Sequence, residues 1–99
     1  MIRHIVSWKL KDADEATRSA AFAEISAALS ALPASLPQIR SLTVARNIAY
    51  PDKNYDVVLV ADFASLEDLD TYQVSPQHVA AAAVVGKHVT ARACVDFEV

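Results

Sequence analysis

Apolar and polar residues alternate in four stretches of the chain, which is the two-residue period of a strand with one buried face. In the first stretch, Ile2, Val6, Trp8 and Leu10 share a face with His4. A histidine on such a face is either buried with a satisfied ring nitrogen or lines a ligand pocket. The four predicted strands are Ile2–Leu10, Ile39–Ile48, Tyr55–Phe63 and Thr90–Val99.

A spacing of three and four residues replaces the alternation after the first strand. Between Asp14 and Leu32, the apolar residues Phe22, Ile25 and Leu29 recur at this spacing, which predicts an amphipathic helix packed on the sheet. Asp12 or Asp14 can cap its first turn. The proline that directly follows the segment ends it.

Two short helices are predicted on either side of a tight corner. Ser65 caps the first, which ends near Tyr72. The pair Ser75-Pro76 begins the second, because serine accepts a bond from an unpaired N–H and proline has no N–H to leave unpaired. His78 then occupies the third helical position, so Tyr72 and His78 flank one corner and can share a cavity.

The order of these elements predicts an α+β fold in a single domain spanning residues 1–99. Two strand-helix-strand units with right-handed crossovers give a ferredoxin-like βαββαβ arrangement, in which helices cover one face of a four-stranded antiparallel sheet. No linker or clear repeat interrupts the chain.

The strand faces turned away from the helices are predicted to have apolar middles and charged ends. A solvated sheet face does not need an apolar middle, so we expect a homodimer in which two sheets stack into a dimeric α/β barrel. The predicted middle comprises Ile5, Leu42, Val44, Val58, Val60 and Cys94, and the predicted rim comprises Arg3, Lys9, Arg40, Arg46, Asp56, Asp62, Arg92 and Asp96.

Composition narrows the classes of function. The net charge of −3 and the absence of a basic patch argue against nucleic acid and against an anionic membrane as partners. A single cysteine, no signal peptide and no long apolar run predict a cytoplasmic protein. Neither a metal-binding motif nor a glycine-rich phosphate loop is present, so no metal or cofactor is predicted.

Three segments resemble the stress-responsive dimeric α/β-barrel (Dabb) domain. They are the opening Ile2–Lys11, the corner Tyr72–His78 with its Tyr-x-x-x-Pro-x-His pattern, and the terminal Ala93–Val99. The resemblance covers essentially the whole chain and implies small ferredoxin-like subunits that pair into barrels. Some members are plant stress proteins without assigned chemistry, and one plant branch is a polyketide cyclase that closes a ring by aldol chemistry without metal or cofactor.

The same resemblance implies a site. In the cyclase branch, a histidine and a tyrosine at the positions of His78 and Tyr72 carry the chemistry, in a pocket between sheet and helices. The chain departs from the family at Ser75, where histidine is frequent, and at Val57, where the cyclase has histidine, so its substrate is not transferred here. Residues at four further positions line the pocket in that branch: His4, Val6, Trp8 and Phe22.

The corner pair suits proton transfer next to a carbonyl group. An imidazole titrates near neutral pH, and a phenol can donate to a developing enolate. Three alternatives stay open: a binding or stress protein in which both rings are structural, a cofactor-free cyclase, isomerase or lyase with His78 as base and Tyr72 as acid, and a dimeric-barrel monooxygenase. Cys94 is expected to be an inert buried thiol without a base beside it, and His88 to complement a helix dipole.

Overall fold

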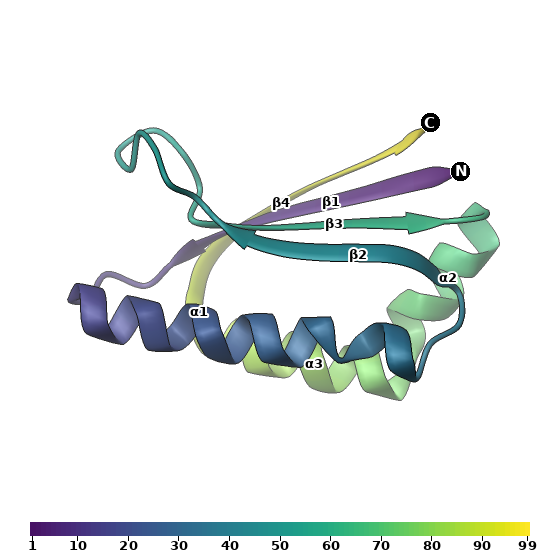
Figure 1. The fold of residues 1–99 in the computed structure, drawn as a ribbon, viewed down its shortest axis with the longest axis horizontal. Coiled ribbons are helices and arrows are strands. Elements are labelled where there is room, and N and C mark those ends of the chain that lie inside the picture. The colour runs from purple at the N-terminus through teal and green to yellow at the C-terminus, as the bar shows by residue number, and fades with distance from the viewer.

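A computed structural model describes all residues of the chain, 1–99. One antiparallel sheet forms the upper layer in Figure 1, and the helices lie beneath it. The predicted α+β architecture is therefore confirmed. The elements are β1 (Ile2–Leu10), α1 (Glu15–Ser30), a 3-10 turn (Leu32–Ala34), β2 (Ile39–Arg46), β3 (Val57–Phe63), α2 (Leu66–Val74), α3 (Pro76–Gly86) and β4 (Val89–Glu98).

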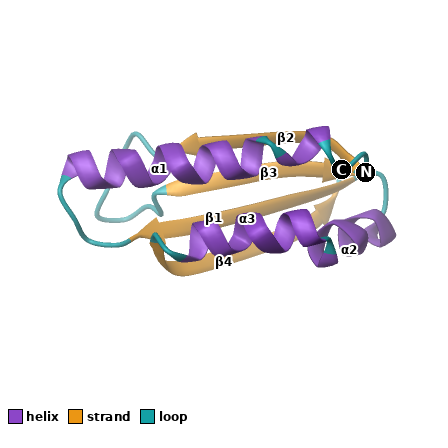
Figure 2. Cartoon of the chain, turned by 90° about the horizontal axis from the view of Figure 1, so that it is seen from below, coloured by secondary structure: helices purple, strands orange, loops and turns teal.

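The sheet has the order β2-β3-β1-β4, with every neighbouring pair antiparallel. Seen from below, α1 and α3 lie side by side beneath the sheet and run roughly along its strands (Figure 2). Seventeen buried apolar residues fill the space between sheet and helices, from Val6 and Trp8 of β1 to Val85 of α3. None of the helices has the length and apolarity needed to cross a lipid bilayer.

Most element boundaries agree with the sequence patterns to within two residues. The first helix ends at Ser30, and the following Pro33 lies in a separate 3-10 turn, because proline cannot continue an α-helix. The last helix ends at Gly86, so His88 lies beyond it. Its Nε2 contacts Oε2 of Glu24 in α1 at 2.9 Å, which gives His88 a specific partner rather than a dipole role alone.

The predicted caps are present. Asp14 accepts a bond from the Thr17 N–H at 2.7 Å, and Ser65 accepts one from the Asp68 N–H at 3.1 Å. The Ser75 hydroxyl accepts from the His78 N–H at 3.2 Å and donates to the Tyr72 carbonyl at 2.9 Å. Ser75 therefore ties the end of α2 to the start of α3.

The predicted facing of β2 is wrong. Its register against β3 shifts between Ile39 and Ser41, and this bulge changes which residues share a face. Leu42 and Val44 consequently pack against the core beneath the sheet, on the same side as buried Ile39. Two predicted rim charges also bond to α1 on the helix side: Arg46 pairs with Glu15 at 2.8 Å, and Asp56 pairs with Arg18 at 2.9 Å.

The predicted facing of β4 is wrong as well. Cys94 pairs with Val6 and Asp96 with His4, and both β1 residues are buried under the helices. Paired residues in a sheet share a face, so Arg92, Cys94 and Asp96 point to the helix side. Val95 and Phe97 of β4 are therefore turned outward.

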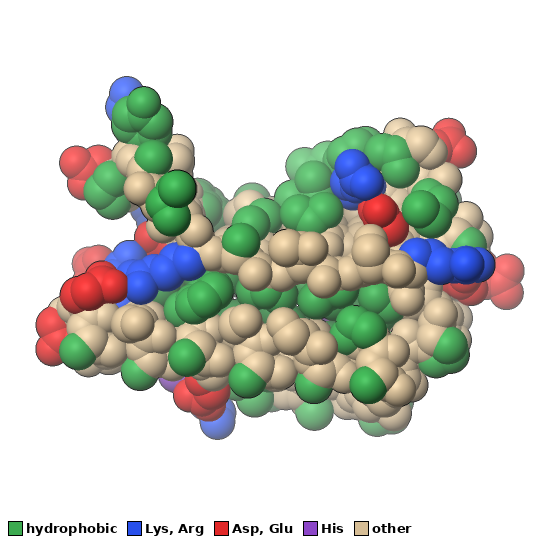
Figure 3. Space-filling model, viewed as in Figure 1, with side chains coloured by type: hydrophobic (Ala, Val, Ile, Leu, Met, Phe, Trp, Pro, Cys, Tyr) green, Lys and Arg blue, Asp and Glu red, His purple; other side chains and the backbone are tan.

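The open face of the sheet, meaning the face without helices, is consequently apolar in its middle. Ile5 lies between Val60 and Val95 in one row across the strands, and Ser7 lies between Val58 and Ala93 in the next. Arg3 and Asp62 form a two-bond ion pair at its edge. In the space-filling view this face is a hollow with hydrophobic side chains along it, beside the projecting β2–β3 loop (Figure 3).

We expect Ser75→Ala to destabilise the protein by about 1–2 kcal/mol, because the buried hydroxyl closes the corner and caps α3. Chemical denaturation at fixed protein concentration measures this loss. Ser30→Ala is the control: Ser30 is exposed and makes no side-chain bond, so its change stays within about 0.5 kcal/mol. Equal stability of the two variants would contradict the role given to Ser75.

Candidate functional site

A cavity of about 200 Å³ lies between the sheet and α3. Its volume is below the roughly 300–1,000 Å³ of drug-sized pockets, which suits a small ligand. Most of its wall is apolar, and four polar side chains enter it: His4, Tyr72, His78 and Arg92. The remaining lining residues are Val6, Trp8, Leu29, Leu59, Ala82, Val85, Gly86 and Val89.

Five of the six residues expected from sequence to form a site line this cavity. His4, Val6 and Trp8 come from β1, where every second side chain points to the helix side, and Tyr72 and His78 come from the corner between α2 and α3.

Phe22 lies elsewhere. The buried stripe of α1 runs through Ala21, Ile25 and Leu29, so Phe22 sits at its margin and is half-buried against the core. Leu29 is the residue of α1 that reaches the cavity. Val57, the position of the cyclase histidine, is buried in the core and does not line the cavity either.

The rings of Tyr72 and His78 are adjacent, with centroids 4.5 Å apart. Nδ1 of His78 lies 3.0 Å from the carbonyl oxygen of Gln73. Since a carbonyl only accepts hydrogen bonds, Nδ1 carries the hydrogen, and the neutral ring then has a lone pair on Nε2. Burial lowers the pKa of His78, and the bond to Gln73 opposes part of that shift. The ring is therefore neutral at pH 7 and can accept a proton.

Tyr72 combines deep burial with an unpartnered hydroxyl. Its side chain is 1% exposed and packs on the Phe63 ring at 5.0 Å, yet its hydroxyl makes no hydrogen bond within the protein. Burial raises the pKa of Tyr72 to about 12, so the phenol stays protonated at physiological pH. A protonated phenol beside the cavity is a hydrogen-bond donor for an oxygen of a bound ligand.

His4 is 2% exposed, and its Nδ1 bonds to a carboxylate oxygen of Asp96. His4 therefore has a satisfied ring nitrogen and also lies in the wall of the cavity, while its role toward a ligand stays a prediction. Sequence reasoning missed Asp96 as a partner because the two residues are 92 positions apart and meet only through the pairing of β1 with β4.

The expectation that Cys94 has no base beside it is wrong. Its Sγ lies 3.7 Å from Nδ1 of His4. Burial nevertheless raises the pKa of the Cys94 thiol, and the charge of Asp96 raises it further. The thiol is therefore a poor nucleophile at neutral pH.

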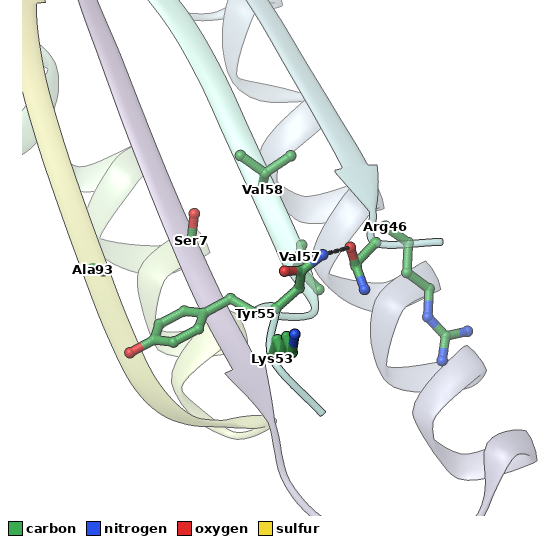
Figure 4. A pocket seen from close by; sticks show the side chains of 9 residues that line it. Ser7, Arg46, Lys53, Tyr55, Val57, Val58 and Ala93 are labelled. Carbon is green, nitrogen blue, oxygen red and sulfur yellow. Dashed lines mark hydrogen bonds between the residues drawn. The ribbon is translucent and has the colours of Figure 1, made fainter. Parts of the chain in front are cut away.

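A second hollow, of about 480 Å³, lies on the open face of the sheet and contains none of the four polar cavity residues. Ser7, Val58 and Ala93 enter it from three neighbouring strands, and the Tyr55 ring extends across it from the end of the β2–β3 loop (Figure 4). It therefore lies on the opposite side of the sheet from the enclosed site.

Comparison with known sequences matches the sequence model for the stress responsive A/B barrel domain (Dabb) to residues 2–99. The chain belongs to this family. A dimeric protein of unknown function and ferredoxin-like fold from Bacteroides fragilis NCTC 9343 is 32% identical, with a TM-score of 0.90 over 99% of this chain and 95% of its own. A dimeric ferredoxin-like protein of unknown function from Thermobifida fusca is 28% identical, with a TM-score of 0.83 over 99% and 90%.

A hydroxynitrile lyase from Passiflora edulis has the same fold, with a TM-score of 0.79 over 97% of this chain and 90% of its own. At 15% identity this likeness concerns the fold alone. A search among curated proteins found no match. Membership of the Dabb family is thus established for this chain, and the two bacterial relatives are dimeric proteins of unknown function.

Titration of His78 should make the protein less stable as the pH falls. Its pKa is below 6.5 in the folded state and near 6.5 when unfolded, so the unfolded chain takes up the proton first. Between about pH 7 and pH 5, wild type should lose more unfolding free energy than His78→Gln, measured by urea denaturation at one protein concentration. If the unfolding free energies of the two proteins changed equally with pH, burial would not lower the pKa of His78.

Proposed function

We propose that the cavity binds a small carbonyl compound and transfers a proton at the carbon next to the carbonyl group. The observation that carries this proposal is the hydrogen bond from Nδ1 of His78 to Gln73, which directs the lone pair of the ring to Nε2. Beside it, the unpartnered Tyr72 hydroxyl supplies the donor that such a reaction needs.

The step can be written with its atoms balanced. Nε2 of His78 takes a proton from the carbon next to the carbonyl, and the electrons of the broken C–H bond move into a C–C double bond. The carbonyl oxygen becomes an enolate oxygen and accepts a hydrogen bond from the Tyr72 hydroxyl. In one course the enolate carbon attacks a second carbonyl carbon, and the oxygen of that carbonyl takes the proton from His78 as its C=O double bond opens. In the other course an enolate conjugated with a neighbouring C=C bond regains the proton from His78 at the far carbon of that bond, which shifts the double bond. The first course is an aldol or cyclase reaction and the second is an isomerisation.

The surroundings of the pair support this assignment. Apolar walls exclude water, which strengthens the hydrogen bond from Tyr72 to a developing negative charge. Arg92 is the one permanently charged residue of the lining, and its positive charge favours an anionic intermediate. The open space beside both rings distinguishes the cavity from an interior plugged by Trp8 and Phe22, which would favour a purely structural role.

Exchange of carbon-bound hydrogen for deuterium tests the proposal without knowledge of the natural substrate. We expect wild-type protein in D2O to speed exchange at the carbons next to the carbonyl of 2-heptanone, followed by NMR. His78→Ala should reduce the catalysed rate about 10²–10⁴-fold, because the base is removed. Tyr72→Phe should reduce it about 10²–10³-fold, because one donor to the enolate is removed.

His88→Ala is the matched control, because His88 bonds to Glu24 outside the cavity, and it should exchange at the wild-type rate. Exchange that is unaffected by His78→Ala would remove this residue from the mechanism. Binding of the ketone without any exchange would assign the cavity to a binding protein, which is the first of the alternatives drawn from sequence.

We also propose that the chain forms a homodimer through the open face of its sheet. The middle of this face is apolar, with Ile5, Val60 and Val95 in one row, whereas the ion pair of Arg3 with Asp62 lies at its edge. An apolar centre inside a polar rim is the usual composition of a subunit interface. The relatives described as dimeric support this pairing.

Two valines test the location of this interface. Val95 is 62% exposed on the open face, and Val79 is 57% exposed on α3. We expect Val95→Asp to convert a dimer at micromolar concentration into a monomer, because it places a carboxylate in the apolar centre. Val79→Asp should remain dimeric. Sedimentation measures the oligomeric state of both variants. A Val95→Asp variant that remained dimeric would place the interface elsewhere.

A further inference from the structure

Three side chains with metal-binding atoms converge where β1 lies beside β4. They are Nδ1 of His4, Sγ of Cys94 and the carboxylate of Asp96, and these atoms all lie within 4.8 Å of one another. We refer to them as the His4–Cys94–Asp96 cluster. The pairing of the two strands produces it, because His4 lies opposite Asp96 and Cys94 lies opposite the next inward-facing residue of β1, Val6.

Two of the three spacings among these atoms match a small tetrahedral ion, and the third pair, Nδ1 of His4 and the Asp96 carboxylate, is joined by a direct hydrogen bond that an entering ion would replace. Zinc binds sulfur at about 2.3 Å and imidazole nitrogen at about 2.0–2.1 Å, which puts two tetrahedral ligands about 3.5 Å apart. In the cluster, Sγ lies 3.7 Å from Nδ1 of His4 and 3.9 Å from Oδ2 of Asp96. The donor set of one thiol, one imidazole and one carboxylate suits Zn²⁺, whereas Mg²⁺ and Ca²⁺ prefer oxygen ligands.

The geometry is unlike that of a cysteine nucleophile activated by a histidine. In such a site, the carboxylate orients one ring nitrogen and the nucleophile bonds to the other. Here both Asp96 and Cys94 approach Nδ1 of His4. Because both partners lie at the same ring nitrogen, the three groups can chelate a cation, but His4 cannot pass a proton from Cys94 through its ring toward Asp96.

The cluster is held in place and can be reached from solvent. The His4 ring stands edge-on to Phe63 at 6.4 Å and to Tyr72 at 6.1 Å, so its plane is fixed by packing. All three residues lie on paired strands. The Asp96 side chain is 36% exposed, which gives an ion a path from solvent to the cluster.

We propose that the His4–Cys94–Asp96 cluster is a binding site for a zinc-like divalent cation. Binding displaces the proton of the Cys94 thiol to solvent, and the ring hydrogen of His4 moves to Nε2, so that Nδ1 can bind the ion. Sequence motifs do not show this site, because His4 is about 90 residues from Cys94 and Asp96 and meets them only through strand pairing. The proposal stands independently of the chemistry assigned to His78.

Cobalt provides a spectroscopic test, because a thiolate bound to Co²⁺ gives an intense charge-transfer absorption in the near ultraviolet. Titration of the full-length, metal-free protein with Co²⁺ should develop this band up to one ion per chain, and Zn²⁺ should abolish it by displacement. Cys94→Ala should lack the band. Asp96→Asn should reduce the affinity for Co²⁺ by about 10–100-fold or more, because loss of a group that only orients a metal ligand already costs that much.

Glu98→Gln is the matched control. Glu98 is an exposed carboxylate two residues beyond Asp96 on the same face of β4, and it makes no side-chain contact with the cluster. Its titration should be indistinguishable from that of wild type. Unchanged Co²⁺ binding in Cys94→Ala would overturn the proposal, and so would the absence of binding by wild-type protein at micromolar Co²⁺ and Zn²⁺.

A measurement on the wild-type chain avoids any effect of substitution on folding. Cys94 is the only cysteine, so alkylation by iodoacetamide reports on it alone. One equivalent of Zn²⁺ should slow alkylation, and a chelator should restore the original rate, because a bound thiolate cannot attack the reagent. An alkylation rate that does not respond to Zn²⁺ would count against the site.

Discussion

The register of β1 in the sheet is the constraint on which the other features depend. This strand pairs with β3 on one side and with β4 on the other, so each of its side chains is assigned to one face. His4, Val6 and Trp8 enter the cavity under the helices, while Ile5 and Ser7 belong to the open face. A slip of one residue would exchange these sets and remove both surfaces at once.

Burial determines what the two corner rings can do. The same apolar wall lowers the pKa of His78 and raises that of Tyr72 to about 12. One ring is thereby kept neutral with a lone pair, and the other is kept neutral with a proton to share. A neutral base of lowered pKa is available at pH 7 but weak, so the hydrogen bond from Tyr72 has to supply much of the stabilisation of an enolate.

Local signals in the sequence were sufficient to predict the helices, the strands and the corner between α2 and α3. Serine at positions 65 and 75 marked two helix starts, and the alternating patterns marked four strands, because caps and two-residue periods are properties of neighbouring residues. Resemblance to the Dabb domain then indicated a pocket, and five of its six expected residues meet in one cavity. Phe22 lies elsewhere, since the helical period alone does not say which side of α1 reaches that cavity.

The sequence by itself determined that each strand has two unlike faces, but only the tertiary structure decided which face meets the helices. In β2 a bulge after Ile39 turned Leu42 and Val44 inward, and in β4 pairing with β1 turned Cys94 and Asp96 inward. In these two strands both faces contain apolar residues, so alternation by itself does not say which face the helices cover. That choice comes from hydrogen bonds between strands far apart in the chain, and it places His4, Cys94 and Asp96 together.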